Sequence, residues 1–228
     1  MSYVIEAPQV VSLPINGTDK RFPVRRIFCV GKNFVAHAEE MGGEVDREAP
    51  FYFMKDAFHL IEAKGNIPMA TRTDDYHHEV ELVAALKSGG TNISAESALD
   101  HVFGYGVGLD MTRRDLQSAC KAKRRSWDIG KNVENSCVCS PLEPANANTR
   151  HNAGMLELKV NGEVRQSADM SDHVWSLPEV IADLSTLYSL EPGDLIMMGT
   201  PAGVGPVVAG DRLEGSAENV GAFDVTFV

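Results

Sequence analysis

The sequence of 228 residues predicts an α+β fold that is rich in β-strands, and three observations lead to this prediction. Short apolar runs recur along the chain, bounded by Gly, Pro, Asn or Asp, which is typical of strands and turns. Only a few segments have helical spacing. These segments interrupt the strands without alternating with them, which argues against a doubly wound or barrel α/β fold.

The composition is that of an ordinary globular protein, with 43% hydrophobic and 23% charged residues. The net charge of −11 argues against a nucleic-acid partner, whose binding surface is usually basic. No secretion signal and no apolar run long enough to span a membrane is visible, so we expect a cytoplasmic protein. We expect its four cysteines, including Cys137 and Cys139, to be reduced and to pack in the interior.

The first 24 residues are predicted to form a short N-terminal extension with a hairpin at Asn16-Gly17, and residues 25–228 the main domain. Residues 25–31 and 51–55 are predicted strands. Between them lies a short helix, with Asn33 as its N-cap and Gly42-Gly43 as its end.

The central part begins with a strand, "HHEVELVAAL" (77–86), followed by a short Ser-capped helix at 94–102. Residues 103–111, "FGYGVGLDM", form a strand whose glycines allow something to approach the backbone closely. Its "GYGVG" lacks the spacing of a dinucleotide-binding loop. A helix over 112–127 is expected to be capped by Thr112.

The C-terminal part contains a hairpin over 155–168, which turns at Asn161-Gly162. A helix over 176–190 has Pro178 near its start, where proline is favoured. A strand then runs into a Gly/Pro-rich loop at 195–206, and closing strands complete the fold.

Glu79 and Glu81 are two carboxylates within an apolar strand, and residues two apart in a strand project to the same face. Periodicity alone favours a solvated edge of the sheet. The alternative is a site for a hard cation such as Mg²⁺, which takes oxygen ligands and removes the repulsion between the two acids. Asp110, at the end of another apolar strand, supports the alternative, because three acids leave positions open for substrate.

A second group of polar residues has the chemistry of a catalytic site. His37 and Glu40 share a helix face, and a carboxylate beside an imidazole supports a general base. Arg114 and Gln117 are three apart on the helix that follows Asp110, and Lys131 lies further along the chain. Arg suits bidentate binding of a substrate carboxylate.

Seven stretches, in order, resemble the fumarylacetoacetate hydrolase family, specifically its fumarylpyruvate hydrolase and acylpyruvase branch. They are "VGKNFVAHAEEMG", "FYFMK", "HHEVELV", "GYGVGLDMTRRDLQ", "SWDIGK", "VNGEVRQ" and "PGDLIMMGTPAGVGPV". The resemblance implies a mixed β-sandwich roll, usually a homodimer. Departures from the family pattern include Lys32 and Phe34 in place of Arg and Tyr, "KDAF" in place of "KP" after the strand at 51–55, and "GKNVENS" in place of "GKGFDxS" at 130–136.

The resemblance also implies roles for individual residues. Those at matching positions are three metal ligands (Glu79, Glu81, Asp110), a catalytic dyad on a lid (His37, Glu40), and four residues that contact substrate or stabilise an oxyanion (Arg114, Gln117, Lys131, Thr200). The cation would be Mg²⁺, with Mn²⁺ as a second choice, and the partner a small oxo-acid. His77 and His78 are interpreted as neighbours of the site, not ligands.

The expected reaction is hydrolysis of an acylpyruvate such as fumarylpyruvate, in which His37 and Glu40 activate a water and the metal stabilises the pyruvate enolate. Oxaloacetate decarboxylation, or a related isomerisation, could use the same enolate-stabilising half of the site. A catalytically inactive metal-binding member is the non-enzyme alternative, and metal-dependent turnover on a panel of acylpyruvates would exclude it.

Overall fold

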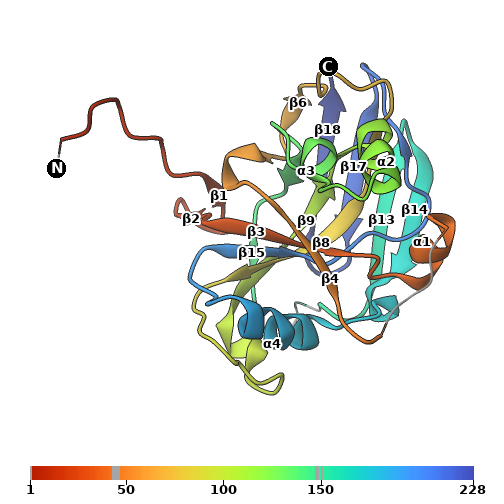
Figure 1. Cartoon of the computed structure of the whole chain (residues 1–228). Helices are drawn as coiled ribbons and strands as arrows, with labels where there is room; N and C mark the ends of the chain where they lie inside the picture. Colours follow the sequence, from red (N-terminus) through yellow and green to blue (C-terminus); the bar gives the residue numbers. More distant parts are fainter. Residues whose placement is uncertain (1, 43–46, 147–148, 150) are drawn as a thin grey trace.

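The computed structural model describes residues 2–42, 47–146, 149 and 151–228 (Figure 1). Its largest sheet contains, in spatial order, β4 (Phe51–Lys55), β3 (Arg26–Gly31), β15 (Asp194–Met197), β8 (Val80–Leu86), β9 (Val102–Asp110), β11 (Cys137–Cys139) and β5 (Leu60–Glu62), with β12 (Glu143–Pro144) also paired to β9. A five-stranded sheet contains β14 (Glu163–Asp169), β13 (Met155–Val160), β17 (Arg212–Ala217), β18 (Gly221–Phe227) and β6 (Gly65–Ile67).

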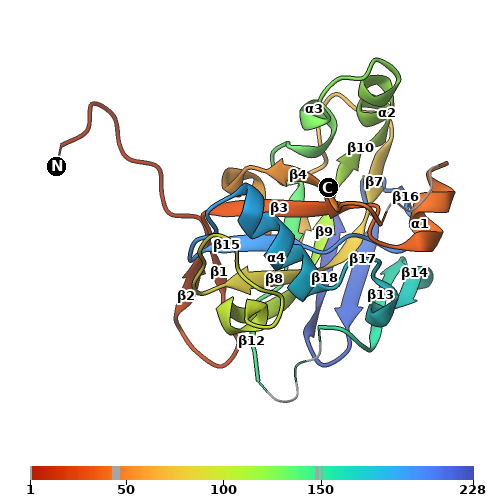
Figure 2. The same ribbon diagram turned by 60° about the horizontal axis from the view of Figure 1, so that its bottom comes forward.

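Two small sheets and several short helices complete the described structure. The small sheets are β10 (Thr112–Arg113), β7 (Tyr76–His78) and β16 (Gly205–Pro206), and the hairpin β1 (Ser12–Pro14) with β2 (Arg21–Pro23). The α-helices are α1 (Val35–Glu40), α2 (Arg114–Ala122), α3 (Asp128–Lys131) and α4 (Leu177–Leu187); 3₁₀ turns are η1 (Ala57–His59), η2 (Ala98–His101) and η3 (Met170–Asp172). Figure 2 shows α2 and α3 together beside β10, and α1 near β16.

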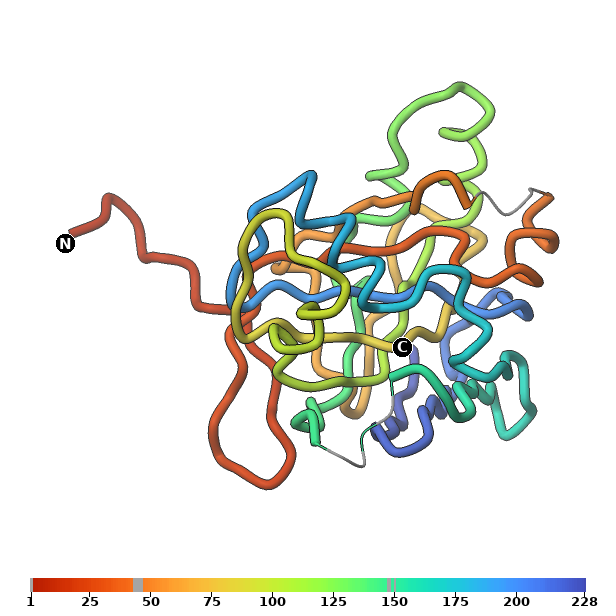
Figure 3. The backbone as a smooth tube through the Cα atoms, turned by 90° about the horizontal axis from the view of Figure 1, so that it is seen from below, coloured from red at the N-terminus to blue at the C-terminus, as the bar shows by residue number. Residues whose placement is uncertain are grey.

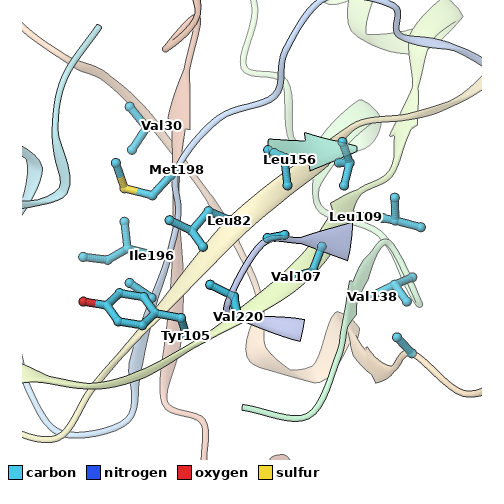
Figure 4. Packing of buried hydrophobic residues seen from close by; sticks show 14 of the residues in the cluster. Val30, Leu82, Tyr105, Val107, Leu109, Val138, Leu156, Ile196, Met198 and Val220 are labelled. Carbon is cyan, nitrogen blue, oxygen red and sulfur yellow. The ribbon is translucent and has the colours of Figure 1, made fainter. Parts of the chain in front are cut away.

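The predicted β-rich α+β class is confirmed, and the core shows how the sheets are layered. Leu82 and Ala84 of β8 enter a cluster that contains Leu156 and Val225 of the five-stranded sheet. Figure 4 shows Leu82 and Leu156 in this cluster. The intervening residue Val83 enters a second cluster on the opposite face. The central strand of the large sheet is therefore buried on both faces, so any charged residue on it needs a buried partner.

Two local predictions are confirmed, although α4 ends at Leu187, three residues earlier than predicted. The hairpin between β13 and β14 turns at Asn161 and Gly162, which have φ of 53° and 82°, as a two-residue hairpin turn requires. Helix α4 begins with a capping box in which the Ser176 N–H donates to Glu179 Oε2 at 2.8 Å, with Pro178 in the first turn.

The N-terminal region has two parts with different environments. Residues 2–10 are exposed and run away from the body of the molecule (Figure 3). The hairpin β1–β2 forms around Asn16-Gly17 as predicted, and its Leu13 and Phe22 are buried in the second cluster. A domain boundary near residue 24 stays a prediction.

The predicted N-cap of the first helix is wrong. Helix α1 is preceded by Phe34, and no side chain caps it. The Asn33 amide instead donates to the carbonyls of Met198 at 2.8 Å and Trp175 at 3.0 Å, and its oxygen accepts from the Trp175 N–H. Asn33 thus ties three distant segments together. The helix end predicted at Gly42-Gly43 agrees with Gly42, which follows the C-cap Met41 with φ of 68°, whereas Gly43 lies outside the described residues.

Two further helix predictions need correction. Helix α2 begins at Arg114 and ends at Ala122, so it is shorter than predicted, and Thr112 belongs to β10. The Thr112 hydroxyl donates to Glu79 and to the carbonyl of Asp110, so it does not cap the helix. Residues 94–102 contain only the 3₁₀ turn η2.

The glycines of β9 serve packing between strands. A Cβ at Gly104 would lie 2.3 Å from the carbonyl oxygen of Glu143, and one at Gly108 would lie 2.9 Å from that of Val138. Both distances are shorter than real contacts allow. The close approach expected at this strand is therefore made by β11 and β12.

All four cysteines are free and buried, as predicted. No helix among the described residues is long and apolar enough to cross a membrane.

His173 gives the fold a predictable dependence on pH. Its ring packs on Phe34 with centroids 4.4 Å apart, and Nδ1 donates to the Met170 carbonyl at 2.7 Å. Burial lowers its pKa to about 4, against an ordinary value near 6.5. Because the unfolded chain then binds the proton more tightly, this contribution to stability is complete above pH 6.5 and is lost as the pH falls towards 4.

We therefore expect the free energy of unfolding to fall by about 2 kcal/mol more in the wild type than in His173→Phe between pH 7 and pH 5. Urea unfolding at the two pH values measures this difference. An equal pH dependence in both proteins would contradict the assignment.

Candidate active site

Three buried carboxylates meet at one end of the large sheet. Glu79 lies at the break between β7 and β8, Glu81 lies on β8, and Asp110 ends β9. One oxygen from each lies within 4.8 Å of the others, and the residues are 4%, 2% and 0% exposed. The strand predicted over 77–86 is thus two strands in different sheets. Glu79 and Glu81 still converge, while Val80 and Leu82 pack into the main core on the other side.

Two cationic side chains partly neutralise this cluster. The Lys131 ammonium donates to Glu79 at 2.8 Å and to Asp110 at 2.5 Å, and the Arg114 guanidinium donates to Glu79. Burial alone would raise the pKa of Glu79, but Lys131 and Arg114 lower it below its usual range. Burial opposes the charge of Lys131, but Asp110 and Glu79 raise its pKa on balance.

Glu81 is the acid that lacks a cationic partner. Its Oε2 accepts from the Gly199 N–H at 2.8 Å, and no side chain among the described residues forms an ion pair with it. Burial, and then the charges of Asp110 and Glu79, raise its pKa well above the ordinary value. A divalent cation suits this arrangement, because three carboxylate oxygens are hard ligands and their repulsion would be removed.

Lys55 is a buried cation behind the cluster. Its role was not predicted from the sequence. Its ammonium forms an ion pair with Asp110 at 2.8 Å and donates to the Met111 carbonyl and the Ser136 hydroxyl. It also donates to the main-chain carbonyl of Lys131. The only signal in the sequence is a lysine at the end of the apolar strand "FYFMK". Lys55 holds Asp110 and Lys131 in place.

We expect Lys55→Met to lower the free energy of unfolding by about 3 kcal/mol or more, because it removes one partner of a buried ion pair. Lys64→Met, at an exposed lysine, is the control and should change stability by less than about 0.5 kcal/mol. Urea denaturation measures both. Equal stability of the two variants would show that Lys55 has no such role.

The predicted His37–Glu40 pair is formed on α1. His37 Nδ1 lies 3.2 Å from Glu40 Oε2, and His37 is 7% exposed. The Gly203 N–H donates to Glu40 Oε1 at 3.0 Å, so the loop after β15 holds the carboxylate. With Nδ1 donating to Glu40, Nε2 is the ring atom that remains to accept a proton.

The remaining predicted residues also reach this region. Arg114 donates to Gln117 Oε1 at 2.6 Å, and both side chains are buried. The Thr200 hydroxyl accepts from Gln166 Nε2 at 2.7 Å. Gln166 ends the stretch "VNGEVRQ", and the sequence alone predicts no role for it. It is the residue that positions Thr200.

The two histidines preceding Glu79 are neighbours of the site, in agreement with the sequence interpretation. His78 Nδ1 lies 3.0 Å from Gln166 Oε1, which also accepts from the Val80 N–H. His77 lies 3.4 Å from the Arg114 Nε and 2.8 Å from Asp75. Neither histidine belongs to the carboxylate cluster.

One pocket, about 450 Å³ of empty space that includes open solvent, is lined by eight of the nine predicted site residues; Glu40 is the exception. Among the residues that depart from the family pattern, Lys32 lines this pocket, whereas Phe34 and Phe58 do not. Phe34 packs on His173, and Phe58 is 62% exposed. The aromatic walls are Phe53 and Trp127.

Two of the departures from the family pattern contact each other. Asn132, in "GKNVENS", accepts from the Asp56 N–H at 2.6 Å and lies 2.7 Å from His59 Nδ1. A proline at position 56 would have no N–H to donate. The Asp56 substitution and the Asn132 substitution are therefore complementary.

Comparison with known proteins shows which family this chain resembles. The model of the fumarylacetoacetate hydrolase C-terminal family matches residues 26–228. A fumarylpyruvate hydrolase of Ralstonia sp is 44% identical over 82% of this chain and 97% of the relative. A mitochondrial oxaloacetate decarboxylase of Dictyostelium discoideum is 38% identical over 83% of this chain and 87% of the relative.

A solved structure extends the similarity to the whole chain. The crystal structure of fumarylpyruvate hydrolase from Pseudomonas aeruginosa in complex with Mn²⁺ and pyruvate superposes with a TM-score of 0.96 at 42% identity, covering 100% of this chain and 99% of that one. The chain belongs to the fumarylacetoacetate hydrolase family.

Proposed function

We propose that this enzyme hydrolyses the carbon–carbon bond of an acylpyruvate. We propose fumarylpyruvate as the substrate, because a 44% identical relative and a 42% identical solved structure are fumarylpyruvate hydrolases. The observation that carries the proposal is the meeting of two groups in one pocket. His37 lines the pocket that holds the three acids, and Glu40 supports it as a base from just outside the lining. The first group suits activation of water and the second suits a divalent cation.

His37 would accept a proton from water at Nε2, with Glu40 stabilising the resulting imidazolium. The hydroxide adds to the acyl carbonyl carbon, and the bond between that carbon and the methylene of the pyruvate part then breaks. The electron pair stays on the methylene carbon. His37 then donates its proton to this methylene carbon. Overall, fumarylpyruvate and water give fumarate and pyruvate.

The other residues of the pocket would bind charge. Lys131 and Gln117 can donate to an oxyanion that develops on the acyl carbonyl, and donors fixed before reaction are the most effective. Arg114 is suited to the substrate carboxylate, and Thr200 presents a hydroxyl held by Gln166.

Glu79, Glu81 and Asp110 would hold the divalent cation, for which we propose Mg²⁺, with Mn²⁺ as a substitute. Such an ion supplies a Lewis acid at the 2-oxo-acid end of the substrate. The same donor set is compatible with both ions, so metal content after purification and activity with each ion distinguish them.

Oxaloacetate decarboxylation is the second candidate, because a relative of that name is 38% identical to this chain. The deciding experiment compares fumarylpyruvate and oxaloacetate with one preparation and one metal. We expect the higher kcat/KM for fumarylpyruvate. A much higher value for oxaloacetate would replace the hydrolase proposal.

We further propose a cytoplasmic homodimer, as the family resemblance implies. Light scattering coupled to size-exclusion chromatography tests the oligomeric state. A monomer at working concentration would refute this part of the proposal without affecting the chemistry.

A further inference from the structure

Helix α2 carries a row of polar side chains along the pocket. Arg114, Gln117 and Lys121 all line it, and their spacing of three and four residues places them on one helix face. Arg114 and Gln117 are buried beside the carboxylates, whereas Lys121 is exposed. The row therefore runs from the inner end of the pocket to its mouth, about 10 Å along the helix at 1.5 Å per residue.

A second lysine reaches the mouth from another element. Lys32 follows β3 in a left-handed conformation with φ of 57°, is exposed, and lines the same pocket. Lys32 and Lys121 thus line one pocket from two elements, and burial, then the charges of Lys32 and Arg114, lower the pKa of Lys121. Neither forms an ion pair with a described residue.

The wall between the two ends is mainly apolar. Phe53, Trp127 and Met41 line it, and the Lys121 ammonium lies 5.9 Å from the Trp127 ring centroid. The acids among the described lining residues are the three of the inner cluster. The pocket thus has a polar inner end, an apolar middle and a cationic mouth.

We propose that Lys32 and Lys121 bind the second carboxylate of a long 2-oxo-dicarboxylate and so determine specificity for chain length. This inference rests on the proposed function and names its substrate class. Six carbon–carbon bonds separate the carboxylate carbons of fumarylpyruvate, about 7 Å when extended, against three bonds and about 4 Å in oxaloacetate. Only the longer dianion spans the pocket from the inner cluster to the lysines.

The test uses two ligands of equal length, 2-oxoheptanedioate and 2-oxoheptanoate. They differ only in the terminal carboxylate, and neither can be hydrolysed, because both lack the acyl carbonyl of an acylpyruvate. Calorimetry of the Mn²⁺-loaded protein should show about tenfold tighter binding of the dianion. The double variant Lys32→Met/Lys121→Met should reduce this preference to less than twofold. Lys123→Met, at an exposed lysine of the same helix end that does not line the pocket, should keep it.

Equal affinities in the wild type, or a preference unchanged in the double variant, would overturn the inference. Turnover separates this result from the proposed function. Failure of the wild type to hydrolyse either fumarylpyruvate or acetylpyruvate refutes the hydrolase proposal, whereas the calorimetric preference decides the role of the two lysines on its own.

Discussion

Replacing Glu81 by glutamine is expected to remove tight binding of the divalent cation and to lower kcat/KM by on the order of 10³ or more. Glu81 is the carboxylate without a cationic partner among the described residues, so its charge is available to a metal. Glutamine keeps the shape and still accepts from the Gly199 N–H. Metal content and activity should therefore fall together, measured by calorimetry and steady-state kinetics.

Stability separates this effect from misfolding. Because Glu81 is repelled by Asp110 and Glu79, its replacement should leave the metal-free protein at least as stable as the wild type. Glu96→Gln, at an exposed glutamate, is the matched control and should change neither metal content nor activity. A Glu81→Gln protein with full metal binding and turnover would refute the role as a ligand.

Replacing His37 by alanine is expected to give the opposite combination, intact metal binding with loss of hydrolysis. A general base contributes roughly 10²–10⁴ to the rate, so kcat on fumarylpyruvate should fall within this range. Decarboxylation of oxaloacetate needs no activated water. Any such activity of the wild type should fall much less in the variant.

Glu40→Gln is the companion of this experiment. It keeps the side-chain shape beside His37 Nδ1 but removes the charge that stabilises the imidazolium. The decrease in kcat on fumarylpyruvate should therefore be smaller than in His37→Ala. Loss of metal from the His37→Ala protein, or equal losses on both substrates, would contradict the assignment of His37 as the base for water.

Local sequence was sufficient wherever the physical rule is itself local. Alternation along residues 80–86 placed Glu81 on the face opposite Leu82, because successive side chains of a strand point to opposite sides. The turn at Asn161-Gly162 and the beginning of α4, which has Ser176 as its N-cap, also follow from residues close together in the chain. These features depend on residues within about four positions of each other.

The predictions that a single side chain caps a helix were wrong where a distant segment forms hydrogen bonds with that side chain. Asn33 and Thr112 both have the chemistry of a helix cap, and each donates elsewhere. Asn33 reaches Met198, 165 positions away, and Thr112 reaches Glu79, 33 positions away. Both side chains are buried, so the bonds offered by the fold outweigh a cap exposed to solvent.

The sequence by itself determined the strand-rich class, the family resemblance and the identity of the three acids, because spacing and ordered motifs carry that information. The tertiary structure decided which charges neutralise which acid: Lys55 and Lys131 at Asp110, Arg114 and Lys131 at Glu79, and no side-chain cation at Glu81 among the described residues. These pairs join residues 21 to 55 positions apart. The periodicity of the sequence cannot predict these ion pairs, because they depend on how whole sheets pack together.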